Sequence, residues 1–197
     1  MSGRSKIATT LLCAAVLLWT GCADRASKLP DYGKVPAFRV TDSNAQAFDS
    51  STLDGKVWVV DFIYTNCPAA CPMMSTKMHS VAKRVAGQDD VRLVSISVDP
   101  ARDTPAALTA FARRYGGPTT QWIFLTGSPE NIHLLAYTTF HVGDVLGKIE
   151  HSTKFMLVDK RGHIRGYYST LSGDEGSRSD DIPAMLRDID SLRRQKS

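Results

Sequence analysis

Apolar positions along residues 37–197 follow two alternating periods. Residues 57–64 form a nearly continuous apolar run, rich in β-branched and aromatic side chains, as in a strand buried on both faces of a sheet. Residues 72–86 instead place Met74, Met78 and Val81 at helical spacing. The same criteria predict further strands at 38–40, 91–98, 122–125, 155–158 and 164–168, and further helices at 104–115, 128–138 and 181–194.

The order of these elements predicts the fold class. Strands alternate with helices until the last two strands, which a turn at Lys160-Arg161-Gly162 joins as a hairpin before the final helix. This order is typical of an α/β protein, and specifically of a thioredoxin-like fold with a mixed central sheet flanked by helices. The length of 197 residues and the absence of internal repeats suit one such domain with an appendage.

The N-terminus carries a targeting pattern. Arg4 and Lys6 precede an uncharged stretch over 7–19, which has the length of a signal-peptide core and is shorter than the ~20 residues of a spanning helix. Leu18-Trp19-Thr20-Gly21-Cys22 then resembles the bacterial lipobox, although its tryptophan is larger than the usual residue. The resemblance implies lipidation of Cys22, and simple export with cleavage nearby or an uncleaved anchor is the alternative.

These features predict three parts and a location outside the cytoplasm. We expect a lipoprotein-type signal peptide at 1–21, a polar tether at 22–36 and one domain at 37–197, anchored to a membrane on the periplasmic side of the cell envelope. The net charge is +4, and two of these charges lie in the signal peptide, so the domain is too balanced in charge for a nucleic-acid binder. The chain also lacks a glycine-rich phosphate loop and a motif context for a Ser-His-Asp triad.

The cysteines are the main candidates for chemistry. Of the four, Cys13 and Cys22 lie in the targeting pattern, which leaves Cys67 and Cys71 in the domain. A disulfide between them would close so small a loop that it would add little stability, so redox or metal chemistry explains the pair better. They follow a buried strand and open a helix, where sites of α/β sheets lie and where a helix N-terminus lowers a thiol pKa.

Three motifs carry a resemblance to a known family. The segment Asn66-Cys67-Pro68-Ala69-Ala70-Cys71-Pro72 is similar to the C-P-x-x-C-P signature of the Sco (SenC/PrrC-like) proteins. Residues 97–105 and 151–159 are similar to two further Sco signatures, in the same order and spacing. The resemblance implies a thioredoxin-like copper-binding protein whose metal ligands are Cys67, Cys71 and His151. A structural zinc site would usually need a fourth protein ligand.

Other side chains near these motifs have less specific roles. Met73 and Met74 are both possible soft ligands, although Met74 also matches the core face of its helix, which favours packing. Asp99 either shapes the site, offers a distant oxygen ligand or caps the next turn. Four further histidines lack a motif and are expected to be structural or exposed, namely His79, His133, His141 and His163. Packing or supporting roles are expected for Tyr64, Asn66 and Phe155.

The resemblance implies a copper metallochaperone for the binuclear copper site of cytochrome c oxidase subunit II. Such a protein carries Cu(I) or Cu(II) between partners and needs no catalytic turnover. The main alternative is a thiol–disulfide reductase in which Cys67 and Cys71 act as a redox pair on the copper-site cysteines of the oxidase. Redox or copper sensing for a partner kinase and a peroxiredoxin-like peroxidase are the remaining alternatives, in that order.

Overall fold

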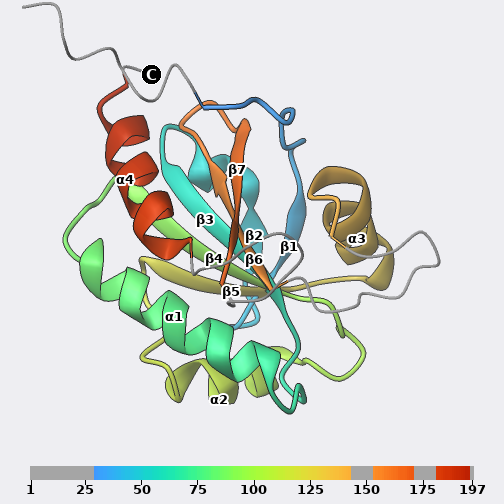
Figure 1. Cartoon of the computed structure of the whole chain (residues 1–197). Coiled ribbons are helices and arrows are strands. Elements are labelled where there is room, and N and C mark those ends of the chain that lie inside the picture. The colour runs from blue at the N-terminus through green and yellow to red at the C-terminus, as the bar shows by residue number, and fades with distance from the viewer. Residues whose placement is uncertain (1–28, 143–152, 171–180, 196–197) are drawn as a thin grey trace, which may run out of the picture.

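The computed structural model describes residues 29–142, 153–170 and 181–195, and all structural statements below concern these ranges. The elements follow the predicted order closely (Figure 1). In chain order they are β1 (Arg39–Asp42), β2 (Ala47–Asp49), the 3-10 turn η2 (Ser50–Leu53), β3 (Val57–Ile63), α1 (Ala70–Arg84), β4 (Val91–Ser97), α2 (Pro105–Arg113), β5 (Trp122–Thr126), α3 (Pro129–His133), the π-helical turn η3 (Leu134–Thr139), β6 (Lys154–Val158), β7 (Ile164–Ser169) and α4 (Ile182–Arg193).

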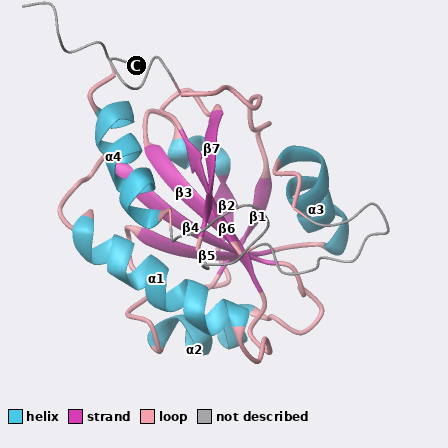
Figure 2. Ribbon diagram, in the orientation of Figure 1, coloured by secondary structure: helices cyan, strands magenta, loops and turns pink. Residues whose placement is uncertain are grey.

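The strands form one mixed sheet in the order β2-β1-β5-β4-β3-β6-β7 (Figure 2). β3, β4 and β5 run parallel at its centre, because α1 and α2 provide the crossovers that parallel neighbours need. β6 pairs antiparallel with β3, and β7 with β6, which is the predicted hairpin. The prediction of an α/β fold with a mixed central sheet flanked by helices is therefore confirmed.

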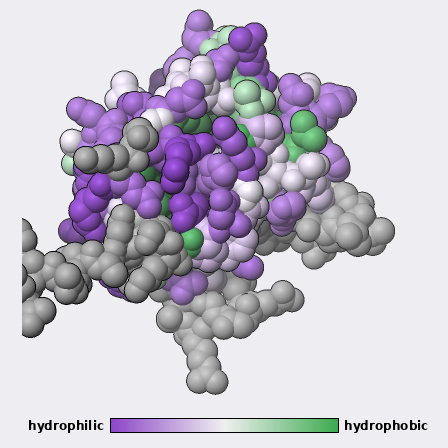
Figure 3. Space-filling model, turned by 90° about the horizontal axis from the view of Figure 1, so that it is seen from above, coloured by the Kyte–Doolittle hydropathy of each residue, from purple (hydrophilic) through white to green (hydrophobic). Residues whose placement is uncertain are grey.

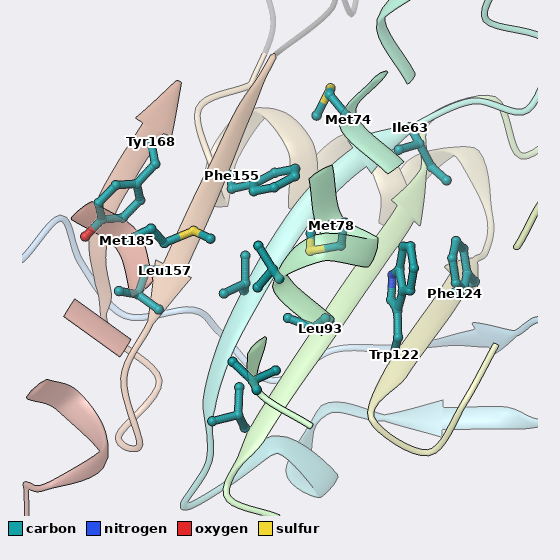
Figure 4. Packing of buried hydrophobic residues seen from close by; sticks show 14 of the residues in the cluster. Ile63, Met74, Met78, Leu93, Trp122, Phe124, Phe155, Leu157, Tyr168 and Met185 are labelled. Carbon is teal, nitrogen blue, oxygen red and sulfur yellow. The ribbon is translucent and has the colours of Figure 1, made fainter. Parts of the chain in front are cut away.

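Helices cover both faces of the sheet, and each face has its own apolar core. α1, α2 and α4 pack on one face, where fully buried side chains such as Met78, Leu93 and Trp122 lie between α1 and the central strands (Figure 4). α3 and η3 cover the other face, where Ile132 and Phe140 pack against side chains of β3 and β4. β3 is buried along its whole length, as its apolar run predicted.

Two local features differ from the sequence prediction. β2 is a strand of only three residues, too short for an alternating pattern to be recognised. The helix predicted at 128–138 is α-helical only through His133 and continues as a π-helical turn, in which the Phe140 N–H binds the Leu135 carbonyl 3.0 Å away and five residues back. This wider turn keeps Leu135, Ala136 and Phe140 together in the core.

Residues 29–35, which we call the N-terminal strap, lie against β7 rather than extending as a tether. The Tyr32 N–H donates to the Ile164 carbonyl at 2.9 Å, and the Ile164 N–H donates to the Gly33 carbonyl at 2.9 Å. This pairing partly covers an edge strand whose free backbone groups would otherwise be exposed. The described part of the predicted tether at 22–36 thus belongs to the domain, a tertiary contact that its polar, proline-containing sequence did not indicate.

The strap and the β3–α1 connection lie at opposite ends of the molecule. The strap runs along the upper edge of Figure 1, and the connection from β3 to α1 lies at the lower edge. Seen from above, the described surface is mainly hydrophilic with isolated apolar spots (Figure 3). No helix in the described ranges is long and apolar enough to cross a membrane.

Replacing Thr104 with alanine should lower the free energy of unfolding by about 1 kcal/mol, because its hydroxyl caps α2. That hydroxyl accepts the Ala107 N–H at 3.3 Å, and Pro105 occupies the first helical turn. Urea denaturation of Thr104→Ala and Thr104→Ser would check this, since serine keeps the capping oxygen. Equal stabilities for the two variants would contradict the assigned cap.

Candidate metal and redox site

The two domain cysteines lie where β3 leaves the sheet. The Ile63 carbonyl, at the last residue of β3, accepts the Val98 N–H at 2.8 Å. The chain then turns, with the Cys67 N–H donating to the Tyr64 carbonyl at 3.3 Å. Cys71 lies in the first turn of α1, which begins at Ala70, two residues before its predicted start. The carboxyl end of a central strand and the N-terminus of a helix thus meet at this pair.

The Cys67 sulfur acts as the cap of α1. The Cys71 N–H donates to Cys67 Sγ at 3.3 Å. The residue at the cap position, Ala69, has no side chain that could accept a hydrogen bond. Because the first N–H groups of a helix have no acceptor within the helix, the sulfur fills a role usually taken by Ser, Thr, Asp or Asn. The helix N-terminus therefore points its donors at the first cysteine of the motif.

The two free thiols have opposite pKa shifts. Burial raises the pKa of Cys67, but hydrogen bonds from the N–H groups of Cys71 and Ala69, with smaller contributions from the Cys71 and Tyr64 side chains, outweigh it and lower the pKa overall. Burial, with a smaller contribution from the neighbouring Cys67, raises the pKa of Cys71 to about 12. Cys67 is therefore the more acidic thiol of the pair, and Cys71 is the one that holds its proton more strongly.

Tyr64 lies beside Cys67, in the supporting position expected from the sequence. Burial, the hydrogen bond to Cys67 and the charges of the two cysteines raise the pKa of Tyr64 to about 12. Its hydroxyl therefore keeps its proton and serves as a donor to the Cys67 sulfur. Both sulfurs are nearly enclosed, since Cys67 is 6% exposed and Cys71 is 3% exposed.

The remaining predicted metal ligand, His151, and the predicted lipidation site, Cys22, lie outside the described residues. His151 and Cys22 fall in the ranges 143–152 and 1–28, so the structure tests neither of them. Within the described ranges, no group of three or more His, Cys, Asp or Glu side chains could hold a metal ion. The described part of the predicted copper site is thus the pair Cys67 and Cys71, and two sulfur donors suit a soft metal ion.

The two methionines beside the motif have different environments. Met74 is 1% exposed and packs in the core, as its helical spacing predicted. Met73 is 46% exposed. Of the other expected supporting residues, Asn66 is exposed, whereas Phe155 is fully buried in the α1 side of the core.

Asp99 and two of the remaining four histidines have structural partners. The Asp99 carboxylate pairs with Arg102 at 3.0 Å on the surface, and its backbone carbonyl closes the turn that precedes α2. His163 pairs with Asp31 of the strap at 2.9 Å. His133 stacks on a tyrosine of η3, His79 is half-buried and His141 is exposed with a φ of 51°.

Sequence reasoning missed two buried acids near the cysteines. Asp61 is fully buried in β3, and it accepts a hydrogen bond of 2.6 Å from Ser95, which itself accepts one of 3.0 Å from the Trp122 indole. Its second oxygen, Oδ2, is buried without a hydrogen-bond partner in the described structure. Asp103 is 1% exposed and binds the chain just before Cys67. For Asp61 the signal was available, since it is the only charged residue in the apolar run 57–64.

Comparison with known proteins places this architecture in a family. The SCO1/SenC family profile matches residues 27–187. The chain belongs to the SCO1/SenC family. A putative copper-binding protein of Stutzerimonas stutzeri is 30% identical over 149 residues, which cover 71% of this chain and 71% of that protein.

Solved structures of family members share the fold. A SCO1/SenC family lipoprotein from Bacillus anthracis superposes with a TM-score of 0.70 at 33% identity, covering 81% of this chain and 94% of that one. BsSco, described as a member of the Sco family of cytochrome c oxidase assembly proteins with a disulfide switch, has a TM-score of 0.71 at 31% identity, covering 85% of this chain and 97% of BsSco. The resemblance inferred from the three motifs is therefore confirmed, and so is the thioredoxin-like fold.

Proposed function

We propose that this SCO1/SenC protein carries copper, held by Cys67, Cys71 and His151, to the binuclear copper site of cytochrome c oxidase subunit II. The observation that carries the proposal is the Cys67 sulfur, which accepts the Cys71 N–H in the first turn of α1, next to the second thiol. A sulfur stabilised as thiolate at this position is ready to bind a soft metal ion. The family's named relatives, which include a putative copper-binding protein and a cytochrome c oxidase assembly protein, support copper as the cargo and the oxidase as the client.

Copper is the cargo of this site, and the two cysteines contribute differently to its capture. Cys67 is the more acidic of the two sulfur ligands, whereas Cys71 holds its proton strongly and must release it before its sulfur can bind. Loss of that proton becomes favourable when the metal charge replaces it. The near-complete enclosure of both sulfurs keeps the bound ion from water, so its release requires a partner that supplies competing ligands.

We further propose that a lipid on Cys22 holds the domain at a membrane. The lipoprotein from Bacillus anthracis supports this assignment for the present chain. Because the strap begins by residue 29, only residues 23–28 would link the lipid to the domain, a span of at most ~20 Å. So short a link raises the effective concentration of the domain near membrane-bound clients.

Copper titration tests the proposal. The full chain in detergent, with Cys13 and Cys22 replaced by serine, contains only the two domain thiols. We expect one Cu(I) per reduced chain under anaerobic conditions, weaker binding in His151→Ala and no stoichiometric binding in Cys67→Ser/Cys71→Ser. His133→Ala is the matched control, because that exposed histidine stacks on a tyrosine of η3 and should leave copper binding unchanged.

A second candidate function rests on the unequal thiols. Cys67 as thiolate would attack a partner disulfide and form a mixed disulfide, releasing one partner thiolate. Cys71 would then lose its proton and attack the Cys67 sulfur, which oxidises the pair by two electrons and frees the second partner thiolate. The disulfide switch named for BsSco supports this chemistry in the family. No copper binding, together with ready cycling of the pair to a disulfide, would favour this function over copper transfer.

A further inference from the structure

The acid that contacts the cysteine loop is Asp103, from the turn between β4 and α2. Its Oδ2 accepts the Thr65 N–H at 3.0 Å and the Ser97 hydroxyl at 2.6 Å, and its Oδ1 accepts the Thr65 hydroxyl at 2.6 Å. All three partners are donors, so both carboxyl oxygens act as acceptors. Asp103 is 1% exposed, which makes each of these hydrogen bonds expensive to lose.

The contacts of Asp103 fix the segment between β3 and α1, which belongs to no helix or strand. β3 ends at Ile63, and α1 begins at Ala70. Between them, Thr65 lies two residues before Cys67, and Asp103 ties both its backbone and its side chain to the end of β4. Cys67 belongs to this loop, and its sulfur must lie where it can accept the Cys71 N–H. The position of the sulfur therefore depends on Asp103, which fixes the start of the loop from the turn after β4.

The neighbouring acid of the same turn has a different role. Asp99 pairs with Arg102 at the surface, and the Asp99 side chain is 25% exposed. The Asp99 N–H donates to the Ser97 hydroxyl at 3.1 Å. Asp99 therefore stabilises the turn between β4 and α2, whereas Asp103 is the acid that binds Thr65. The two acids, four residues apart in one motif, thus form a natural pair of test and control.

We propose that Asp103 is a positioning residue for the Cys67–Cys71 site. It fixes Thr65 so that both sulfurs are presented to one metal ion, and it acts through the loop without binding the metal. The inference rests on the proposed copper function for its main readout. Replacing a residue that orients a metal ligand without binding the metal typically lowers metal affinity by about 10–100-fold. We expect a loss of Cu(I) affinity of this size here.

The test uses the full chain in detergent, with Cys13 and Cys22 replaced by serine, and the variants Asp103→Asn, Thr65→Val, Thr65→Ser and Asp99→Asn. The probe is copper alone, with Cu(I) affinity measured by competition against a Cu(I) chelator and Cu(II) recorded by its thiolate charge-transfer absorption. Asp103→Asn replaces one accepting oxygen of the carboxyl group with an NH2 group, which then faces partners that are themselves donors. Thr65→Val removes the hydroxyl that donates to Asp103. Both should weaken Cu(I) binding by about 10–100-fold and shift the absorption. Thr65→Ser and Asp99→Asn should match the unaltered chain.

Two measurements keep failures apart. If Asp103→Asn does not fold, as judged by thermal unfolding, the comparison of Thr65→Val with Thr65→Ser decides, because both variants keep the buried acid. If the unaltered chain binds no copper, the proposed function fails, and the reduction potential of the Cys67–Cys71 pair becomes the readout in the same variants. Affinity, absorption and potential that are all unchanged in folded Asp103→Asn or in Thr65→Val would overturn the assignment.

Discussion

Replacing Asp61 with asparagine should remove most of the pH dependence of stability between pH 4 and pH 7. Burial raises the pKa of this carboxyl from 3.8 to about 7, and the hydrogen bond from Ser95 offsets only part of the effect. A shift of this size corresponds to roughly 4 kcal/mol, which makes it the largest pH effect we expect in the described structure between pH 4 and pH 7.

The sign follows from which state holds the proton. Below about pH 4 the carboxyl is protonated in both states, and its burial is tolerated. Between pH 4 and 7 the unfolded chain loses the proton while the folded chain keeps it, so stability falls as the pH rises. Above about pH 7 the folded chain also ionises and the loss is complete. Asparagine is neutral throughout and still offers an oxygen to the Ser95 hydroxyl, which donates to Asp61 at 2.6 Å.

Urea denaturation of the unaltered chain and Asp61→Asn at several pH values would measure this difference. The unaltered chain should lose several kcal/mol more than the variant between pH 4 and pH 7. Ser95→Ala is the second variant, because losing the donor should raise the Asp61 pKa further and extend the fall in stability to higher pH. Parallel curves for the unaltered chain and Asp61→Asn would show that the acid does not titrate as its burial implies.

Arg165→Met should destabilise the domain by about 3–5 kcal/mol, because it leaves a buried carboxylate without its partner. Arg165 is 8% exposed and Asp159 is 3% exposed, and Nη1 of the arginine lies 2.9 Å from Oδ2 of the acid. The same guanidinium donates to the carbonyls of Pro30 at 2.7 Å and Leu29 at 2.8 Å. Chemical denaturation should therefore show the loss of stability, and faster amide exchange at 29–35 should show release of the strap.

Two further variants separate this effect from an ordinary loss of charge. Arg165→Met/Asp159→Asn should recover part of the stability, since it removes the unpaired charge while keeping an oxygen for the backbone N–H groups of Arg161 and His163. Arg39→Met breaks an ion pair with Asp49 in which the arginine side chain is 85% exposed. It should cost less than about 1 kcal/mol. Equal losses for Arg165→Met and Arg39→Met would contradict the buried-pair account.

The candidate site was predictable from sequence only in its local part. Cys67 and Cys71 stand out because a proline-flanked pair directly follows an apolar strand, and both residues lie where that pattern placed them. Asp103 was missed in favour of Asp99, since both belong to the same motif and spacing cannot show which carboxyl turns inward. The inward one was revealed only by its contact with Thr65, which lies 38 residues away in the chain.

The sequence by itself determined the order of the main strands and helices, the mixed central sheet and the family, because apolar periodicity and motif spacing are properties of neighbouring residues. Tertiary structure alone decided the three-residue β2, the strap on β7, the π-helical turn in η3 and the partners of Asp61 and Asp103. The strap, Asp61 and Asp103 depend on groups far away in the chain that supply hydrogen bonds, whereas β2 and η3 depend on apolar side chains that pack against the sheet. A linear pattern does not contain that information, and packing of the folded chain creates it.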